Sequence, residues 1–171
     1  MRKTSAPKPV VNIAEAPLQE LTSPKAKFRA KLARLGPMLG TEKLGAMLTI
    51  VEPGKSAFPF HAHHAIEELF FIVEGTGSYR YGDQTFPVRS GDLLAAPTGG
   101  AAQAHQIVNT GDARLVFLAI STMDPVDIVE YPKTGKLRVY AQGEATDAAR
   151  ARLNHVMRRG SAVDLYDGEE E

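Results

Sequence analysis

Two histidines separated by a single residue, His61 and His63, are the side chains of this sequence best suited to chemistry. Because side chains alternate faces along a strand, both imidazoles project from one side, where they can bind a single metal ion. A carboxylate follows at Glu67 or Glu68, directly before the apolar run of residues 69–73. That run reads as a buried strand, and it carries the carboxylate into the interior. Unpaired buried charge is costly, and coordination to a cation is one common remedy.

A second segment, residues 91–109, supplies a candidate third imidazole. It contains a turn, a short apolar strand, a loop rich in Pro and Gly, and His105 at the start of another strand. The sequence has no cysteine, so metal ligands must be nitrogen and oxygen atoms. Three imidazoles and a carboxylate suit one divalent transition metal, namely Mn, Fe, Co, Ni, Cu or Zn. A six-coordinate metal would keep about two positions for water, O₂ or a chelating substrate.

The two segments resemble the paired motifs of the cupin superfamily, which consists of small double-stranded β-helix barrels. The first motif matches at Gly54, His61, His63, Glu68 and Gly75, and the second at Gly91, Pro97, Gly99, His105 and Asn109. The chain departs from the family pattern by one extra residue before His61 and by a longer loop before His105. The resemblance implies His61, His63, Glu68 and His105 as metal ligands, and the distance to Gly75 favours Glu68 over Glu67.

The resemblance covers nearly the whole chain, which looks like a group of bacterial single-domain cupins that largely lack an assigned reaction. It implies a mononuclear metal protein acting on a small polar molecule, sugar-like or oxidisable. If the protein is an enzyme, the implied classes are metal-dependent isomerase and dioxygenase, and catalytic residues stay unassigned. The alternative is a non-catalytic module that binds or senses a small molecule. The expected inward strands offer no convincing basic cluster, which counts against a phosphorylated substrate.

Three further side chains are candidates for the pocket. Gln103 and Asn109 share strand parity with His105 and would line the pocket if the strand is regular. Tyr79 lies on a predicted hairpin around Gly82-Asp83, and packing is the competing interpretation for it. His64 has the wrong parity for the metal site and is expected at the rim or surface.

The elements that must position these residues are strands, and we expect an all-β jelly-roll barrel with an N-terminal strand arm and a C-terminal extension. Short apolar runs separated by turn residues at intervals of about 8–12 residues are typical of such barrels. We expect a flexible arm over residues 1–9, the barrel over residues 10–140 and the extension over residues 141–171. Within these ranges we predict strands at 10–13 and 25–35, a polar connection at 14–24, a short helix within 145–159 and an acidic tail.

Composition limits the partners. The 171 residues include 20 basic and 20 acidic side chains, so no overall charge attracts nucleic acid or anionic membrane. No apolar run approaches the ~20 residues of a membrane span, and we expect a cytoplasmic protein with a small-molecule ligand. Leu69, Phe71 and Val73 should face outward from their strand, so the outer surface needs cover. Either the amino-terminal strands of the same chain or a second subunit could provide it; cupins commonly pair in this way, and the resemblance implies a homodimer.

Overall fold

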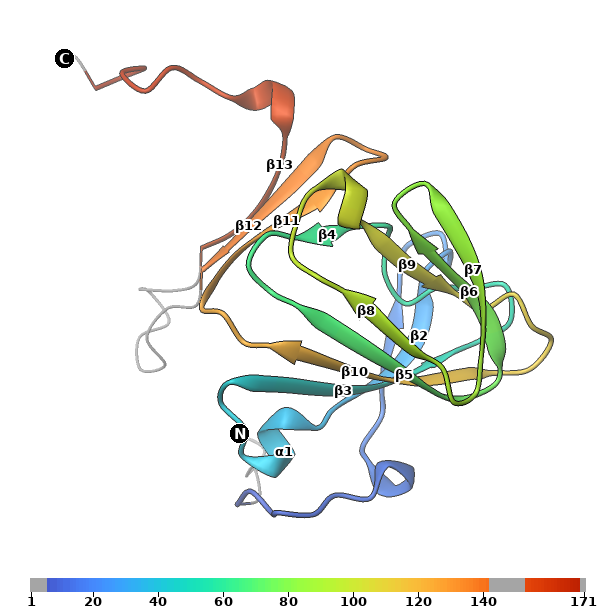
Figure 1. Cartoon of the computed structure of the whole chain (residues 1–171). Coiled ribbons are helices and arrows are strands. Elements are labelled where there is room, and N and C mark those ends of the chain that lie inside the picture. Colours follow the sequence, from blue (N-terminus) through green and yellow to red (C-terminus); the bar gives the residue numbers. More distant parts are fainter. Residues whose placement is uncertain (1–5, 142–152, 170–171) are drawn as a thin grey trace.

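The computed structural model describes residues 6–141 and 153–169, and these residues form three antiparallel sheets (Figure 1). The expectation of an all-β barrel is therefore confirmed. One sheet has the order β1-β2-β3-β10-β5-β8, the second β13-β12-β11-β4 and the third β7-β6-β9. The strands are β1 (Gln19–Thr22), β2 (Arg29–Arg34), β3 (Leu44–Val51), β4 (Ala62–His63), β5 (Glu68–Glu74), β6 (Thr76–Tyr81), β7 (Gln84–Arg89), β8 (Leu93–Ala96), β9 (His105–Val108), β10 (Leu115–Thr122), β11 (Val126–Tyr131), β12 (Lys136–Ala141) and β13 (Leu153–Arg158). The short helices are η1 (Ile13–Glu15), α1 (Gly36–Leu39), η2 (Ala101–Gln103) and η3 (Arg159–Ser161).

The main core lies between the six-stranded sheet and the β7-β6-β9 sheet, and strand β5 shows how the sequence builds it. Phe70 and Ile72 point inward and are buried, whereas Leu69 and Phe71 alternate outward and are 43% and 40% exposed. Residues at every second position share one face of a strand, so the apolar run serves two surfaces. The inner residues join side chains from both sheets, including Val51, Leu94, Ile107, Leu115 and Phe117.

Strand β5 ends at Gly75, where the backbone turns into β6. Gly75 has a φ of 90°, a conformation that residues with a Cβ rarely adopt. A Cβ at this position would also collide with the carbonyl oxygen of Arg114. The positive φ and the lack of space for a Cβ both require glycine at this turn. The turn therefore fixes the end of β5, the strand that begins with Glu68.

The N-terminal region differs from the prediction. Residues 10–13 do not form a strand; Ile13–Glu15 is a turn of 3₁₀ helix, and the Asn12 side chain accepts a hydrogen bond from the Ala14 amide at 2.9 Å. The strand is β1, within the segment expected to be a connection, and it pairs with β2. An edge strand such as β1 is held by backbone pairing more than by an apolar face, so the hydrophobic pattern of the sequence did not reveal it. The predicted strand within residues 25–35 is confirmed as β2.

The N-terminal segment covers part of the outer surface of the six-stranded sheet. Val11 and Ile13 pack against a second buried cluster that contains Leu35, Leu48 and Val116, and Val73 is partly buried there. Of the expected arm, residues 1–5 lie outside the described part of the chain. Further along the arm, the Lys8 amide donates to the Met38 carbonyl oxygen at 2.9 Å. This segment is therefore attached at that point.

The C-terminal extension also differs from the prediction. Where the structure describes the expected helix, it is strand β13, which pairs with β12 from Lys136↔Arg158 to Ala141↔Leu153. Residues 145–152 of that prediction lie outside the described residues. Every β13 residue is exposed and gains little from side-chain packing. Backbone pairing with β12 therefore sets the conformation of this segment, and the local helix preference does not. The described tail residues 167–169 are exposed, as expected. None of the helices within residues 6–141 and 153–169 has the length and apolar character to cross a membrane.

Candidate metal centre

Ligand-type side chains from three separate segments meet inside the barrel. His61 lies just before β4, Glu68 begins β5 and His105 begins β9. One potential ligand atom from each of these three residues lies within 4.8 Å of the other two. Backbone bonds hold the two histidines in register, because the His105 amide donates to the His61 carbonyl at 2.7 Å and the His61 amide donates back at 3.1 Å. The two sequence segments are thus joined at the site itself.

His63 joins this cluster at its edge. Its Nε2 lies 3.6 Å from Oε2 of Glu68, whereas Nε2 of His105 lies 3.0 Å from the same oxygen. The rings of His61 and His63 are 5.0 Å apart between centroids, and His63 is outside the compact three-residue group. Glu67 is exposed, whereas Glu68 contacts His63 and His105, so the structure places Glu68 beside the histidines. All four predicted ligands are neighbours, and Glu68 is the residue that links them.

Hydrogen bonds on the far side of each ring orient the imidazoles. Nδ1 of His61 lies 2.7 Å from the Pro59 carbonyl oxygen, and Nδ1 of His63 lies 2.5 Å from Oδ2 of Asp127. Carbonyl and carboxylate oxygens accept hydrogen bonds, so in the neutral form of each ring Nδ1 carries the proton and Nε2 keeps its lone pair. Nε2 of both rings is therefore the atom available to a cation. Such outer partners commonly fix metal-binding histidines.

The electrostatics favour the protonation states that metal binding needs at two of these residues, His61 and Glu68. Burial, together with the neighbouring His105 and His63, lowers the pKa of His61 to about 4. Burial alone would raise the pKa of Glu68, but the His105 hydrogen bond and the nearby imidazoles outweigh it and lower that pKa. His63 differs, because the Asp127 hydrogen bond and Glu68 outweigh burial and raise its pKa. At neutral pH the structure thus presents a neutral His61 and an ionised Glu68, the forms that coordinate metals.

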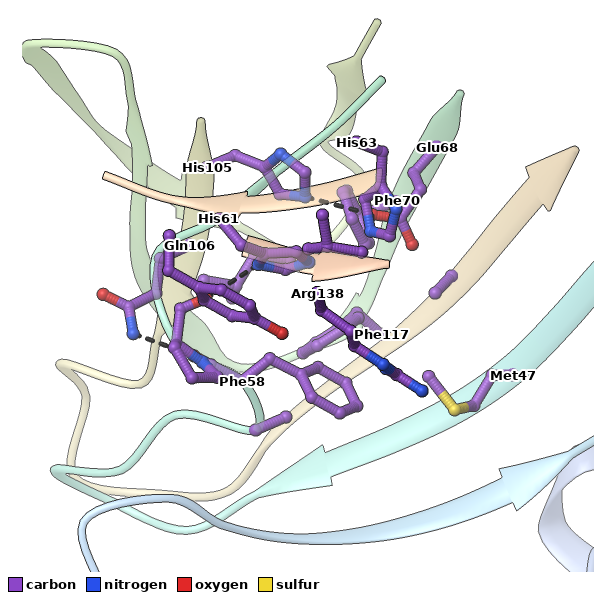
Figure 2. Close-up of a pocket in the computed structure, with 16 residues that line it drawn as sticks. Met47, Phe58, His61, His63, Glu68, Phe70, His105, Gln106, Phe117 and Arg138 are labelled. Atoms are coloured by element: carbon purple, nitrogen blue, oxygen red, sulfur yellow. Dashed lines mark hydrogen bonds and ion pairs between the residues drawn. The ribbon is translucent and has the colours of Figure 1, made fainter. Parts of the chain in front are cut away.

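A cavity of about 230 Å³ opens beside the cluster (Figure 2). His61, His63, Glu68 and His105 occupy one part of its wall, and most of the remaining wall is apolar. Tyr131 lies next to His61, with ring centroids 6.1 Å apart and nearly parallel planes. The lining is completed by Met47, Ala57, Phe58, Pro59, Phe70, Gln106, Ile107, Phe117, Ala119, Val129 and Arg138. The cavity accommodates a small molecule in contact with the histidine cluster.

The three predicted pocket residues do not line this cavity. Tyr79 is buried in the core, and its hydroxyl donates to the Ala95 carbonyl at 2.8 Å. Asn109 is fully buried and donates to the Val51 and Ala113 carbonyls, both at 2.8 Å, so it ties loops together. Gln103 belongs to η2, which interrupts the strand register before His105, and its side chain lies against Gly99. Strand alternation counted from His105 was therefore broken by η2 before Gln103. After His105, it led to Asn109, which is buried in the core and does not line the cavity.

Sequence reasoning missed three site residues on the strands that follow the second motif. Asp127 supports His63 from β11, and Tyr131 and Arg138 line the cavity from β11 and β12. Asp127 gave a usable signal, since an acidic side chain between the apolar residues Val126 and Ile128 needs a partner when it is buried. Arg138 gave no such signal, because polar and apolar residues alternate only weakly along β12. His64 is 43% exposed at its side chain and lies 3.4 Å from Glu130, outside the cluster, as expected for a rim residue.

Comparisons with known proteins agree with this architecture. Residues 47–121 match the family model described as Cupin domain. An oxalate-binding protein from Thermotoga maritima is 31% identical over 68 residues, which are 40% of this chain and 54% of that protein. The chain spans about half the length of the curated relatives it matches.

Two solved structures cover nearly the whole chain. A protein from Acidithiobacillus ferrooxidans, provisionally named a sugar phosphate isomerase, has a TM-score of 0.75 and 26% identity, covering 90% of this chain and 92% of its own. A sugar phosphate isomerase from a cupin superfamily, from Silicibacter pomeroyi, has a TM-score of 0.75 and 22% identity, covering 93% and 98%. The second likeness concerns the fold alone.

Proposed function

Because this chain is a member of the cupin superfamily, with its cupin domain at residues 47–121, we propose that it binds one divalent transition metal through His61, His63, Glu68 and His105. The observation that carries the proposal is the convergence of His61, Glu68 and His105 ligand atoms within 4.8 Å. Nitrogen and carboxylate donors fit Mn, Fe, Co, Ni, Cu or Zn. Such a metal, when bound, supplies Lewis-acid polarisation of a substrate oxygen or a position for O₂.

The remaining residues of the site position a small molecule against the cluster. The apolar wall excludes water from one side of the ligand, and Glu68 and Asp127 supply negative charge that offsets a bound cation. Metal-dependent isomerisation or dioxygenation is the proposed reaction class. The 26% identity to the protein provisionally named a sugar phosphate isomerase, over 90% of this chain, supports the first of these.

The second candidate function is binding without turnover. It is favoured by the 31% identity to a protein named for oxalate binding rather than for catalysis. Incubating metal-loaded protein with sugar phosphates, free sugars, catechols and diketones separates the two functions. Turnover of any of these at a rate that disappears in Glu68→Gln supports the enzyme, whereas saturable binding without product supports the binding module.

Metal binding itself is tested by elemental analysis of protein purified without immobilised-metal chromatography. We expect about one equivalent in the wild type and a loss of most of it in His61→Ala and Glu68→Gln. His64→Ala is the matched control, because His64 lies in the same segment but faces Glu130. Retention of a full equivalent in both cluster variants would contradict the proposal.

We also propose a homodimer formed by the outer surface of the six-stranded sheet. Neighbouring strands β10, β5 and β8 expose large apolar side chains there: Ile120 is 41%, Leu69 43%, Phe71 40% and Leu93 65% exposed. Contiguous apolar surface of this kind marks association sites, and β8 is also a sheet edge. Light scattering after size-exclusion chromatography should give twice the chain mass for the wild type and a monomer for Leu93→Asp. A monomeric wild type would exclude the dimer.

A further inference from the structure

The metal cluster shares its cavity with Arg138, the one permanently charged cation among the described lining residues. Arg138 lies opposite Val129 in the β11-β12 pair, and Val129 lies opposite His63 in the β11-β4 pair. Residues paired directly across strands share a face of the sheet, so these three side chains project to the same side. Two strand spacings of about 4.8 Å place the backbone of Arg138 roughly 10 Å from that of His63.

The guanidinium of Arg138 is held from behind. Its Nε donates to Oδ1 of Asn154 on β13 at 2.8 Å. Figure 2 shows the side chain lying between the histidine cluster and Met47. A restrained guanidinium loses less conformational freedom when it binds an anion, which strengthens the interaction.

The surroundings of Arg138 select the kind of anion. Met47, Phe58 and Phe117 line the cavity beside it and offer no polar groups from their side chains. In such partly desolvated surroundings, attraction between opposite charges is stronger than in water. A guanidinium matches a carboxylate with two parallel hydrogen bonds, whereas a phosphate dianion carries about twice the charge and is better served by several cations.

We propose that the cavity binds a small organic acid, with its carboxylate on Arg138, its apolar body along Met47, Phe58 and Phe117, and a second oxygen group directed at the histidine cluster. The contact of that second oxygen rests on the proposed metal site. The contact with Arg138 does not. Arg138 is on β12, outside the residues that match the cupin domain, so the cation of this anion site comes from the part of the chain that follows the domain.

The test uses three probes of the same shape that differ at one end: 4-hydroxyphenylacetate, its neutral amide 4-hydroxyphenylacetamide, and 4-hydroxybenzylphosphonate. Binding to full-length protein loaded with Co²⁺ is measured by titration calorimetry. We expect the carboxylate to bind the wild type at least about tenfold more tightly than the amide. Arg138→Gln should weaken carboxylate binding by about 10- to 100-fold and leave amide binding unchanged.

Three controls keep the result interpretable. Arg138→Lys retains the positive charge but cannot form the two parallel hydrogen bonds of a guanidinium, so it should have intermediate affinity for the carboxylate. Arg114→Gln removes an arginine that pairs with Glu74 on the surface, away from the cavity, and should bind all probes as the wild type does. Each variant must keep its thermal unfolding transition and its Co²⁺ content.

The outcomes separate this inference from the metal proposal. Equal carboxylate affinity in wild type and Arg138→Gln, or no measurable carboxylate binding to the wild type, would overturn it. Tighter binding of the phosphonate than of the carboxylate would reassign the site to phosphate esters. If the wild type fails to hold Co²⁺, the metal proposal fails. The role of Arg138 is then still decided by comparing the preference for carboxylate over amide between the wild type and Arg138→Gln.

Discussion

At the scale of single residues, the cluster is defined by what lies behind each imidazole as much as by what lies in front. Pro59 contributes a carbonyl oxygen behind His61, and Asp127 contributes a carboxylate behind His63. These partners decide which nitrogen faces Glu68. They also differ in charge: burial and the neighbouring imidazoles lower the pKa of His61 despite the Pro59 carbonyl, whereas the Asp127 carboxylate helps to raise the pKa of His63 against burial.

Replacing Asp127 by Asn should weaken metal binding by about 10- to 100-fold. An amide nitrogen facing Nδ1 of His63 would favour the other tautomer, which places a proton on Nε2. A competition titration against a chromophoric chelator measures the affinity. Asp112→Asn, a change at an exposed turn, is the control and should have no effect. Wild-type affinity in Asp127→Asn would show that His63 needs no carboxylate behind it.

The low pKa of His61 predicts how the stability of the metal-free protein depends on pH. Between pH 6.5 and about 4 the unfolded chain binds a proton at His61 that the folded chain does not, so stability falls as pH falls. This group contributes a loss of up to about 1.4 kcal/mol per pH unit. Urea unfolding in the presence of a chelator should show a shallower decline in His61→Gln than in the wild type. The exposed His155→Gln should decline as the wild type does, and identical curves for all three would refute the assignment.

The residue scale also shows where sequence reasoning succeeded and where it stopped. Strand alternation was enough to place His61 and His63 on one face, whereas the choice of Glu68 over Glu67 came from the cupin resemblance, because Glu68 begins a different strand in a different sheet. His105 required two segments to meet, and the cupin resemblance supplied that step. Asp127 and Arg138 depend on which strand pairs with β4, and no local pattern specifies a pairing over more than 60 residues.

At the scale of elements, turns and edge pairing decide the architecture around the site. The strands with strong alternation, such as β5, and the β6-β7 hairpin were predictable from the sequence. Strands β1 and β13 were not, because both sit at sheet edges and carry mostly exposed residues. Their position is set by backbone bonds to a neighbour, which leave little trace in the hydrophobic pattern.

The turn at Gly75 should tolerate substitution less well than a comparable turn at Gly91. Both have a positive φ, of 90° and 94°, but a Cβ at Gly91 would meet nothing within 4 Å. Gly91→Ala should therefore cost about 1 kcal/mol of unfolding free energy from backbone strain. Gly75→Ala adds a collision with the Arg114 carbonyl and should cost a further ~1–3 kcal/mol. Chemical denaturation measures both, and equal losses would mean that the chain shifts to relieve the collision.

At the scale of the whole molecule, the proposed ligands lie on or beside strands of three different sheets, so metal binding should stabilise the entire barrel. Free metal at 100 times its dissociation constant should raise the unfolding free energy by about 2.7 kcal/mol, because only the folded chain assembles the site. Thermal denaturation with and without metal measures the gain, and a chelator should reverse it. Glu68→Gln, nearly the same in shape, should gain little; a gain equal to that of the wild type would place the metal elsewhere.

The β11-β12 hairpin has a further consequence for redesign. The hairpin follows the residues that match the cupin domain, yet its Tyr131 and Arg138 line the cavity beside the histidines. Exchanging its inward side chains should therefore change which compounds fit the cavity, while the four proposed metal ligands stay as they are. Asp127 is the exception, since it must be conserved in any such graft to keep His63 aligned.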